Sequence, residues 1–183
     1  MKKVICLLLI LISLVACTPK PDTSIEFKIE TYECDMSGYE GLDATKHMFI
    51  GTTVKELQRT MNEKGYGVFV LSRTGCSHCQ MVMQYLNEVA EELDIKIYYI
   101  DGQSDEYPIV GTEDFQILYD LLYTTLPVGK DGKEIQTPEL FTIVDGLITS
   151  YKVGTTWKGN EYDNDDINEL KALYRKMLTP FAS

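Results

Sequence analysis

The four residues Cys76-Ser77-His78-Cys79 are the stretch of the sequence best suited to chemistry. Residues 67–72, just before them, are almost continuously apolar and predict a buried strand, whereas residues 81–93 carry apolar side chains at helical spacing and predict an amphipathic helix. Two cysteines three positions apart at the start of a helix lie within one turn of each other, and the first lies at the positive end of the helix dipole. The pattern therefore indicates thiol–disulfide chemistry.

Each of these side chains has an expected role. At the helix N-terminus the Cys76 thiolate is stabilised by backbone N–H groups and by the helix dipole, which lowers its pKa from about 8.5 toward neutrality or below. Cys76 is therefore the predicted attacking sulfur, and Cys79, one turn further in, is the thiol that resolves the mixed disulfide. A protonated His78 adds positive charge that favours the thiolate. We expect these three residues to be catalytic, with Cys76 and Cys79 forming a redox-active disulfide.

Other uses of a cysteine pair fit the sequence less well. Zinc would need two further ligands, and only His47, His78 and Cys34 remain, without a second closely spaced pair. Haem attachment needs a histidine directly after the second cysteine, where Gln80 stands. We therefore expect no metal and no cofactor. A short structural disulfide, in a domain that only binds a partner, is the remaining alternative.

The first residues have the pattern of a leader for export. Lys2 and Lys3 precede an apolar run over residues 4–12, which is shorter than the about 20 residues needed to span a bilayer. The following Leu14-Val15-Ala16-Cys17 resembles the lipobox of bacterial lipoproteins, which implies cleavage before Cys17 and a diacylglycerol group on its sulfur. A plain secretory leader or an uncleaved anchor is the alternative.

We therefore expect a lipoprotein signal peptide over residues 1–16, a lipidated cysteine and linker over 17–24, and one folded domain over 25–183. The lipobox implies the extracytoplasmic face of the bacterial cell membrane, with the lipid anchor as the contact with the membrane. The chain carries 28 acidic against 17 basic residues, a formal net charge of −11. Nucleic acid should repel such a body, so we expect no nucleic-acid partner.

Cysteine usage predicts one working dithiol. Cys6 leaves with the leader and Cys17 carries the lipid, which leaves Cys34, Cys76 and Cys79. This number is too small for a framework of structural disulfides. We expect Cys34 to be a free thiol; the alternative is a second exchange partner or a regulatory half-cystine.

Hydrophobic spacing and turn signals divide the domain into strands and helices. Residues 31–51 show no clear period. A capping box opens at Thr53, Thr112 can cap a later helix, and Asp145-Gly146 is a hairpin signal. The predicted elements are an edge strand over 25–30, a helix over 54–65, a strand over 67–72, the cysteine helix to 93, a strand over 95–100, a helix over 115–122, a loop over 126–136 that turns at 131–132, hairpin strands over 139–144 and 147–153, and a helix over 165–177.

This order resembles the thioredoxin-like superfamily over about residues 53–180. That superfamily keeps its C-x-x-C pair at the first strand-to-helix junction and a cis-proline just before the hairpin, facing the cysteines; Thr137-Pro138 stands at this place. The resemblance implies an α/β, thioredoxin-like fold, a central mixed sheet flanked by helices, here with an N-terminal strand and helix extension. It also implies that Thr137 and Pro138 bind substrate, with the Thr137 backbone pairing with an extended segment.

Some positions depart from the superfamily pattern. Many relatives keep a buried acid six residues before the first cysteine, as proton acceptor for the resolving thiol, and this sequence has Val70 there. Glu56, Asp101 or a water would have to accept the proton instead. Gly75 replaces an aromatic residue that commonly precedes the first cysteine, and Arg73 either assists the thiolate or is a solvated surface charge.

Together these features predict an extracytoplasmic, membrane-tethered thiol–disulfide oxidoreductase that exchanges disulfides with exported proteins or peptides and with a redox partner protein in the envelope. The Arg-containing approach to the C-x-x-C pair is most similar to small Gram-positive bacteriocin transport accessory proteins. The direction of electron flow is left open, because it depends on the reduction potentials of the couple and its partners. The alternative is a redox-silent module that holds an exported peptide or secretion partner beside Pro138.

Overall fold

The computed structural model describes residues 28–102, 113–156 and 163–182. The predicted leader, the predicted lipidated cysteine and the predicted linker lie outside these ranges, as does the predicted helix cap Thr112. No helix in the described part of the chain is long and apolar enough to cross a membrane. The elements are β1 (Phe49–Gly51), α1 (Val54–Asn62), β2 (Gly67–Ser72), α2 (Ser77–Leu93), β3 (Ile97–Asp101), α3 (Glu113–Leu122), β4 (Val128–Gly129), β5 (Gly132–Lys133), β6 (Glu139–Val144), β7 (Leu147–Val153), α4 (Asn164–Leu178) and a 3-10 turn (Thr179–Phe181).

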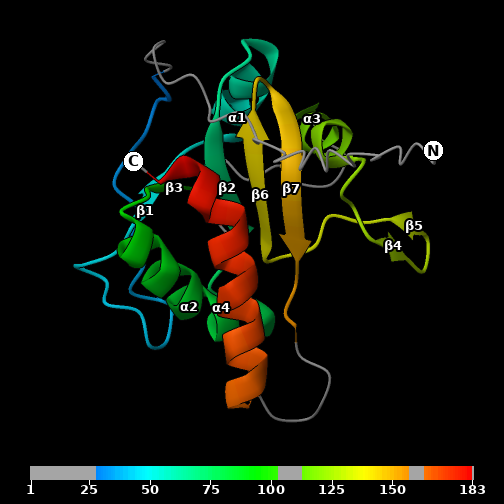
Figure 1. Ribbon diagram of the computed structural model, residues 1–183. Coiled ribbons are helices and arrows are strands. Elements are labelled where there is room, and N and C mark those ends of the chain that lie inside the picture. The colour runs from blue at the N-terminus through cyan, green and yellow to red at the C-terminus, as the bar shows by residue number, and fades with distance from the viewer. Residues whose placement is uncertain (1–27, 103–112, 157–162, 183) are drawn as a thin grey trace, which may run out of the picture.

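The centre of the fold is a five-stranded mixed sheet in the spatial order β1-β3-β2-β6-β7 (Figure 1). β1, β3 and β2 pair in parallel, and β6 and β7 extend the sheet antiparallel. α2 connects the parallel strands β2 and β3, which makes the βαβ unit that the sequence predicts. With helices on both faces of this sheet, the fold is the predicted thioredoxin-like one.

The two faces of β2 belong to two separate cores. Val68 and Val70 pack with α2 and α4, whereas Phe69 and Leu71 pack with α1 and α3. This alternation is the period of two of a strand, and all of β2 is buried because both faces of the sheet are covered. The cysteine helix therefore packs on one face, beside α4 (Figure 1).

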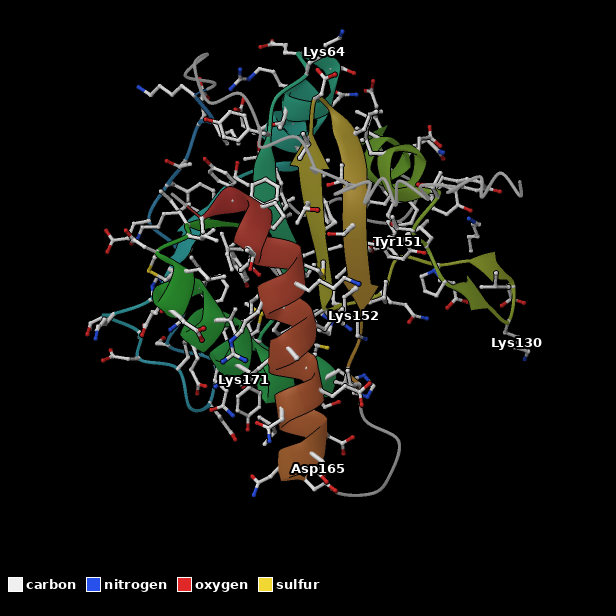
Figure 2. All side chains as sticks on the ribbon, viewed as in Figure 1. Lys64, Lys130, Tyr151, Lys152, Asp165 and Lys171 are labelled. Carbon is white, nitrogen blue, oxygen red and sulfur yellow. The ribbon has the colours of Figure 1, made fainter. Side chains whose placement is uncertain are left out.

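The C-terminal half of α2 is held by ion pairs to α4 and by a backbone hydrogen bond at its end. Ion pairs join Lys171 to Glu88 at 2.6 Å and Arg175 to Glu92 at 2.9 Å, and Figure 2 labels Lys171 on the α4 ribbon. The Ile95 N–H donates to a carbonyl of the last helical turn, so β3 begins two residues later than predicted. These contacts hold the cysteine helix in place at its far end.

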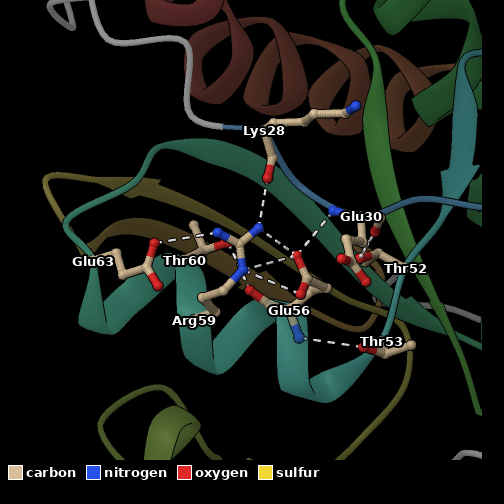
Figure 3. A network of polar contacts seen from close by, with 8 residues as sticks. All are labelled: Lys28, Glu30, Thr52, Thr53, Glu56, Arg59, Thr60 and Glu63. Carbon is tan, nitrogen blue, oxygen red and sulfur yellow. Dashed lines mark hydrogen bonds and ion pairs between the residues drawn. The ribbon is translucent and has the colours of Figure 1, made fainter.

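The N-terminal extension differs from the prediction. Residues 28–30, the described part of the predicted edge strand, are not in a strand, and β1 takes the edge position beside β3 instead. Side chains hold the segment, which explains why Ile29 is buried without a strand ladder. The contacts are Arg59 to the Lys28 carbonyl at 2.5 Å, the Glu30 N–H to Glu56 at 2.9 Å and Thr52 to the Glu30 carbonyl at 3.0 Å (Figure 3).

The predicted loop over 126–136 contains a small ribbon, β4 paired with β5. Its turn comes at Lys130-Asp131, and Gly132 follows with a φ of +124°, which a residue with a side chain rarely adopts. The turn thus lies one residue earlier than the predicted 131–132, because Gly132 already belongs to β5. Strands of two residues are too short to show an alternating pattern, so the sequence did not predict the ribbon.

Candidate active site

Cys76 and Cys79 lie where β2 passes into α2. Cys76 is the N-cap residue of the helix, and its sulfur accepts a hydrogen bond from the Cys79 N–H at 3.3 Å. Cys76 is half-buried, whereas Cys79 is 0% exposed in the core between α2 and the sheet. Both are free thiols in this structure. The fold thus supplies an outer and an inner sulfur within one helical turn.

The loop that carries Thr137 and Pro138 meets the outer sulfur. The peptide bond between these two residues is cis. The Thr137 carbonyl oxygen lies 3.3 Å from the Cys76 sulfur, which donates to it as a thiol. The Pro138 carbonyl accepts from the Gly154 N–H at 2.8 Å, which ties the loop to the end of β7. The structure therefore brings Thr137 to the predicted attacking sulfur, and Pro138 follows it through the cis peptide bond.

The surroundings of the two sulfurs move their pKa values in opposite directions. Burial by itself raises the pKa of Cys76, but hydrogen bonds from the Cys79 thiol, the Thr137 side chain and the backbone N–H groups of Cys79 and His78 outweigh it and lower the pKa below 9.0. Burial, reinforced by the hydrogen bond to Cys76, raises the pKa of Cys79 to about 11. Cys76 is therefore the sulfur that ionises first.

The Cys76 sulfur faces a groove of about 970 Å³. Its walls come from the β2–α2 junction, from α3 and from the segment that leads to Pro138. The rings of Phe115 and Tyr119 on α3 stack at 6.4 Å between centroids and supply an apolar side. The described lining residues are Arg73, Gly75, Cys76, Ser77, His78, Gly102, Phe115, Tyr119, Lys133, Glu134, Ile135, Gln136 and Thr137.

The polar approach to the cysteines lies at the mouth of this groove. The side chains of Arg73 and His78 are exposed there, and Gly75 leaves the Cys76 side of the groove without an aromatic ring. His78 reaches Cys76 through its backbone N–H, and the Arg73 carbonyl accepts from the Cys76 N–H at 3.2 Å. The effect of a charged imidazole on the thiolate stays a prediction.

The predicted proton acceptors for Cys79 lie in different places. Val70 is an apolar core residue in the same cluster as Cys79. Glu56 is on α1, on the other face of the sheet, and its carboxylate accepts hydrogen bonds from Arg59 and from the Glu30 N–H (Figure 3). Asp101, at the end of β3, accepts a hydrogen bond from Tyr99 at 3.3 Å, and Tyr99 belongs to a cluster of hydroxyl groups that reaches Cys79. The structure therefore favours Asp101 over Glu56.

Gln80 holds the N-terminal extension against the site. Its Nε2 donates to the carbonyls of Gly38 at 2.7 Å and Thr74 at 2.6 Å, and its Oε1 accepts from the Glu40 N–H at 2.8 Å. Gln80 was not predicted to have a structural role. No periodic signal could have related it to residues 38–40, which lie far away along the chain.

A buried acid that was not predicted as a site residue, Glu139, stands directly after Pro138. Glu139 is 0% exposed; its Oε1 lies 2.5 Å from the Thr125 hydroxyl, and its Oε2 has no hydrogen-bond partner among the described residues. The Thr125 hydroxyl donates to Glu139 Oε1 and also lies 2.8 Å from the Leu122 carbonyl, so two acceptors share its single proton. Burial raises the pKa of Glu139 to about 7, against the opposing effect of the Thr125 hydrogen bond. An acid opening an otherwise apolar strand was the available signal.

Cys34 is the third cysteine of the described chain. It is 7% exposed and unpaired, which confirms the predicted free thiol. Burial raises its pKa, and the nearby carboxylate of Asp101 adds to the rise. A buried thiol that ionises poorly is a weak nucleophile, so Cys34 does not compete with Cys76.

No family model matches the chain, and no curated protein does. Among solved structures, thioredoxin O2 from Arabidopsis thaliana in the oxidized state is similar with a TM-score of 0.42 and 12% identity, covering 72% of this chain and 95% of that chain. Thioredoxin from Trypanosoma brucei brucei has a TM-score of 0.45 and 12% identity, covering 75% and 98%. A putative oxidoreductase with a thioredoxin fold has a TM-score of 0.42 and 14% identity, and the match covers 68% of this chain and 94% of that chain. These are similarities of fold alone.

Alkylation should separate the two sulfurs. In the reduced protein, the pH midpoint of iodoacetamide modification at Cys76, followed by mass spectrometry, should lie below 9.0, while Cys79 stays unmodified at neutral pH. Thr137→Val keeps the shape of the side chain but removes a donor, so it should raise the Cys76 midpoint. A Cys76 midpoint at 9.0 or above would contradict this assignment.

Glu139→Gln should change stability in a pH-dependent way. The unfolded carboxyl ionises near 4.5 and the folded one near 7, so its stabilising contribution is complete below 4.5 and is lost as the pH rises toward 7. Glutamine cannot ionise, so by chemical denaturation the variant should equal the parent near pH ~4 and exceed it by about 1–3 kcal/mol near pH ~8. The exposed Glu134→Gln is the matched control; equal effects of both substitutions would refute a buried neutral acid at position 139.

Proposed function

We propose that the protein is a thiol–disulfide oxidoreductase that works through Cys76 and Cys79. The observation that carries the proposal is the position of the Cys76 sulfur: it caps α2, faces the groove and lies 3.3 Å from the Thr137 carbonyl. Its pKa is lowered by the surrounding hydrogen-bond donors, which supplies the thiolate that exchange requires. Cys79 lies directly behind it and stays protonated until needed.

The exchange follows from this geometry. The Cys76 thiolate attacks one sulfur of a substrate disulfide, a bond forms between the two sulfurs, and the other substrate sulfur leaves as a thiolate. Cys79 then loses its proton and attacks the Cys76 sulfur, which closes the Cys76–Cys79 disulfide and releases the first substrate sulfur as a second thiolate. The protein dithiol is oxidised by two electrons and the substrate disulfide is reduced; the same steps run backward when the protein is the oxidant.

The groove supports a polypeptide as the substrate. It runs past Cys76 and Thr137, where backbone groups can pair with an extended segment, and it offers the rings of Phe115 and Tyr119 for an apolar side chain. Charges of both signs at its rim are those of Arg73, Lys133 and Glu134. We therefore propose that thiols and disulfides of exported proteins or peptides are the substrates, as in an accessory protein of bacteriocin transport.

The proposed place of action is the extracytoplasmic face of the bacterial cell membrane. The support is the lipobox-like Leu14-Val15-Ala16-Cys17, preceded by two lysines and an apolar run. A diacylglycerol group on Cys17 supplies two acyl chains, which hold a protein on a membrane more firmly than one. A redox partner protein in the envelope completes the cycle by resetting the Cys76–Cys79 couple.

Serine substitutions should separate the two sulfur roles. Cys76→Ser should lower the rate of insulin disulfide exchange by at least about 100-fold, because a hydroxyl does not ionise at neutral pH. Cys79→Ser should accumulate mixed disulfides with exported proteins, detectable on non-reducing gels. Cys34→Ala should exchange like the parent. Full biological activity of Cys76→Ser would favour the alternative, a redox-silent binding module.

Fractionation of the producing bacterium should test the tether. Cys17→Ser cannot carry the lipid, so the protein should move from the membrane fraction to the soluble or secreted fraction. Cys34→Ala should stay with the membrane. Retention of Cys17→Ser in the membrane would instead indicate an uncleaved anchor.

A further inference from the structure

A chain of polar groups runs from Cys79 to the end of β3. The Ser72 hydroxyl hydrogen-bonds to the Cys79 sulfur. The Ser72 oxygen lies 2.7 Å from the Tyr39 hydroxyl, the Tyr39 hydroxyl lies 3.1 Å from the Tyr99 hydroxyl, and the Tyr99 hydroxyl lies 3.3 Å from Asp101 Oδ1. The three oxygen–oxygen pairs lie within hydrogen-bond distance. The hydrogen bond between Ser72 and Cys79 joins this series to the thiol.

This chain leads from a dry interior toward the surface. Ser72 is 0% exposed and Tyr39 and Tyr99 are 2% exposed, whereas Asp101 is only partly buried. The rings of Tyr39 and Tyr99 meet edge to face with centroids 6.3 Å apart, which holds their hydroxyl groups in register. A hydroxyl both donates and accepts a hydrogen bond, so a proton can enter at one side of each group while another leaves at the other.

The proton of the Cys79 thiol needs a path out of the core. Burial raises its pKa to about 11, yet its proton must leave before its sulfur can attack the mixed disulfide. The core position that many relatives fill with an acid is the apolar Val70. Glu139 is a buried acid, but its side chain is hydrogen-bonded to Thr125 and points to the core on the opposite face of the sheet.

We propose that Ser72, Tyr39 and Tyr99 form a proton relay that carries the Cys79 proton to Asp101 while the mixed disulfide is resolved. The inference rests on the proposed function, because it concerns the second half of that exchange. It makes Asp101 the proton acceptor and the three hydroxyl residues the positioned path between acceptor and thiol.

The transfer balances along the path. The Cys79 thiol gives its proton to the Ser72 oxygen, Ser72 gives its own proton to Tyr39, Tyr39 to Tyr99, and Tyr99 to Asp101. After the transfer each hydroxyl donates in the opposite direction, so Ser72 donates to the Cys79 sulfur.

The electron pair left on Cys79 forms the bond to Cys76. The bond between Cys76 and the substrate sulfur breaks, and the substrate leaves as a thiolate. Asp101 then releases the proton to water, and in the reverse reaction the proton returns along the same groups. No further oxidant or reductant enters the step, because the substrate disulfide accepts the two electrons.

The relay assigns a role to the N-terminal extension. Tyr39 belongs to residues 31–51, which showed no pattern in the sequence. Gln80 fixes the neighbouring backbone through Gly38 and Glu40, directly beside the cysteines. The extension therefore contributes a hydroxyl to the core behind the resolving thiol.

The two halves of the exchange can be timed separately. The reduced protein is mixed with 5,5′-dithiobis(2-nitrobenzoate), quenched in acid at set times, and analysed by mass spectrometry. The first step is the appearance of the nitrobenzoate adduct on Cys76, and the second is its replacement by the Cys76–Cys79 disulfide. Mass analysis distinguishes the Cys76 adduct from adducts on other cysteines.

Removing one relay hydroxyl should slow only the second step. Tyr99→Phe and Tyr39→Phe should each slow resolution by at least about tenfold, with the first step unchanged. Tyr98→Phe is the matched control: it is the same substitution on the same strand, but its ring packs against Phe69 on the other face. Asp101→Asn should slow resolution like the tyrosine variants, and Asp101→Glu should restore part of the rate.

Solvent isotope measurements distinguish a relay from a packing effect. In the parent protein, the resolution rate should fall along a curved line as the D₂O fraction rises, because several protons move together. In Tyr99→Phe the line should become straight. Resolution rates equal to those of Tyr98→Phe, or slowing of both steps alike, would overturn the relay. Failure of the proposed function has another signature, which is a parent protein that resolves the adduct with the curved response but does not exchange insulin disulfides.

Discussion

The hydrogen bond from the Cys79 N–H to the Cys76 sulfur is the interaction on which the site depends. It occupies one of the N–H groups that a helix leaves unpaired at its start, so the sulfur acts as the cap of α2. The same bond places positive partial charge against that sulfur and favours its thiolate. One contact therefore marks where the helix begins, favours ionisation of Cys76 over Cys79 and places the second sulfur one turn further in.

The sheet gives the partly buried Asp101 and the buried Glu139 different surroundings. On the α2 side, the hydroxyl groups of Ser72, Tyr39 and Tyr99 satisfy one another and end at Asp101. On the α1 side, Glu139 accepts a hydrogen bond from the Thr125 hydroxyl. Because buried polar groups need partners, each cluster is held in place by its own hydrogen bonds. The hydroxyl cluster and Cys79 lie on one face of the sheet and Glu139 on the other, so the proposed exchange uses only the α2 face.

The N-terminal extension is part of the site's framework. Arg59 and Glu56 bind the backbone of residues 28–30 on one side of the sheet (Figure 3), and Gln80 binds residues 38–40 on the other. Between them, β1 covers the edge of β3. This covering buries Tyr99 and shields the hydroxyl cluster from water, which is how a segment far from the cysteines in sequence shapes their surroundings.

Local spacing, capping and turn residues were enough to predict the βαβ unit, the hairpin and the position of Cys76 and Cys79 at a helix start. The position of Pro138 opposite the cysteines was predicted from the resemblance to the thioredoxin-like superfamily. The residues that surround the two sulfurs became known only from the tertiary structure. Tyr39, Tyr99 and Gln80 come from distant segments with no shared period, and strand register alone sets the face to which Glu139 points. Contacts across the sheet depend on packing, and no local pattern in the chain encodes which distant residues will meet.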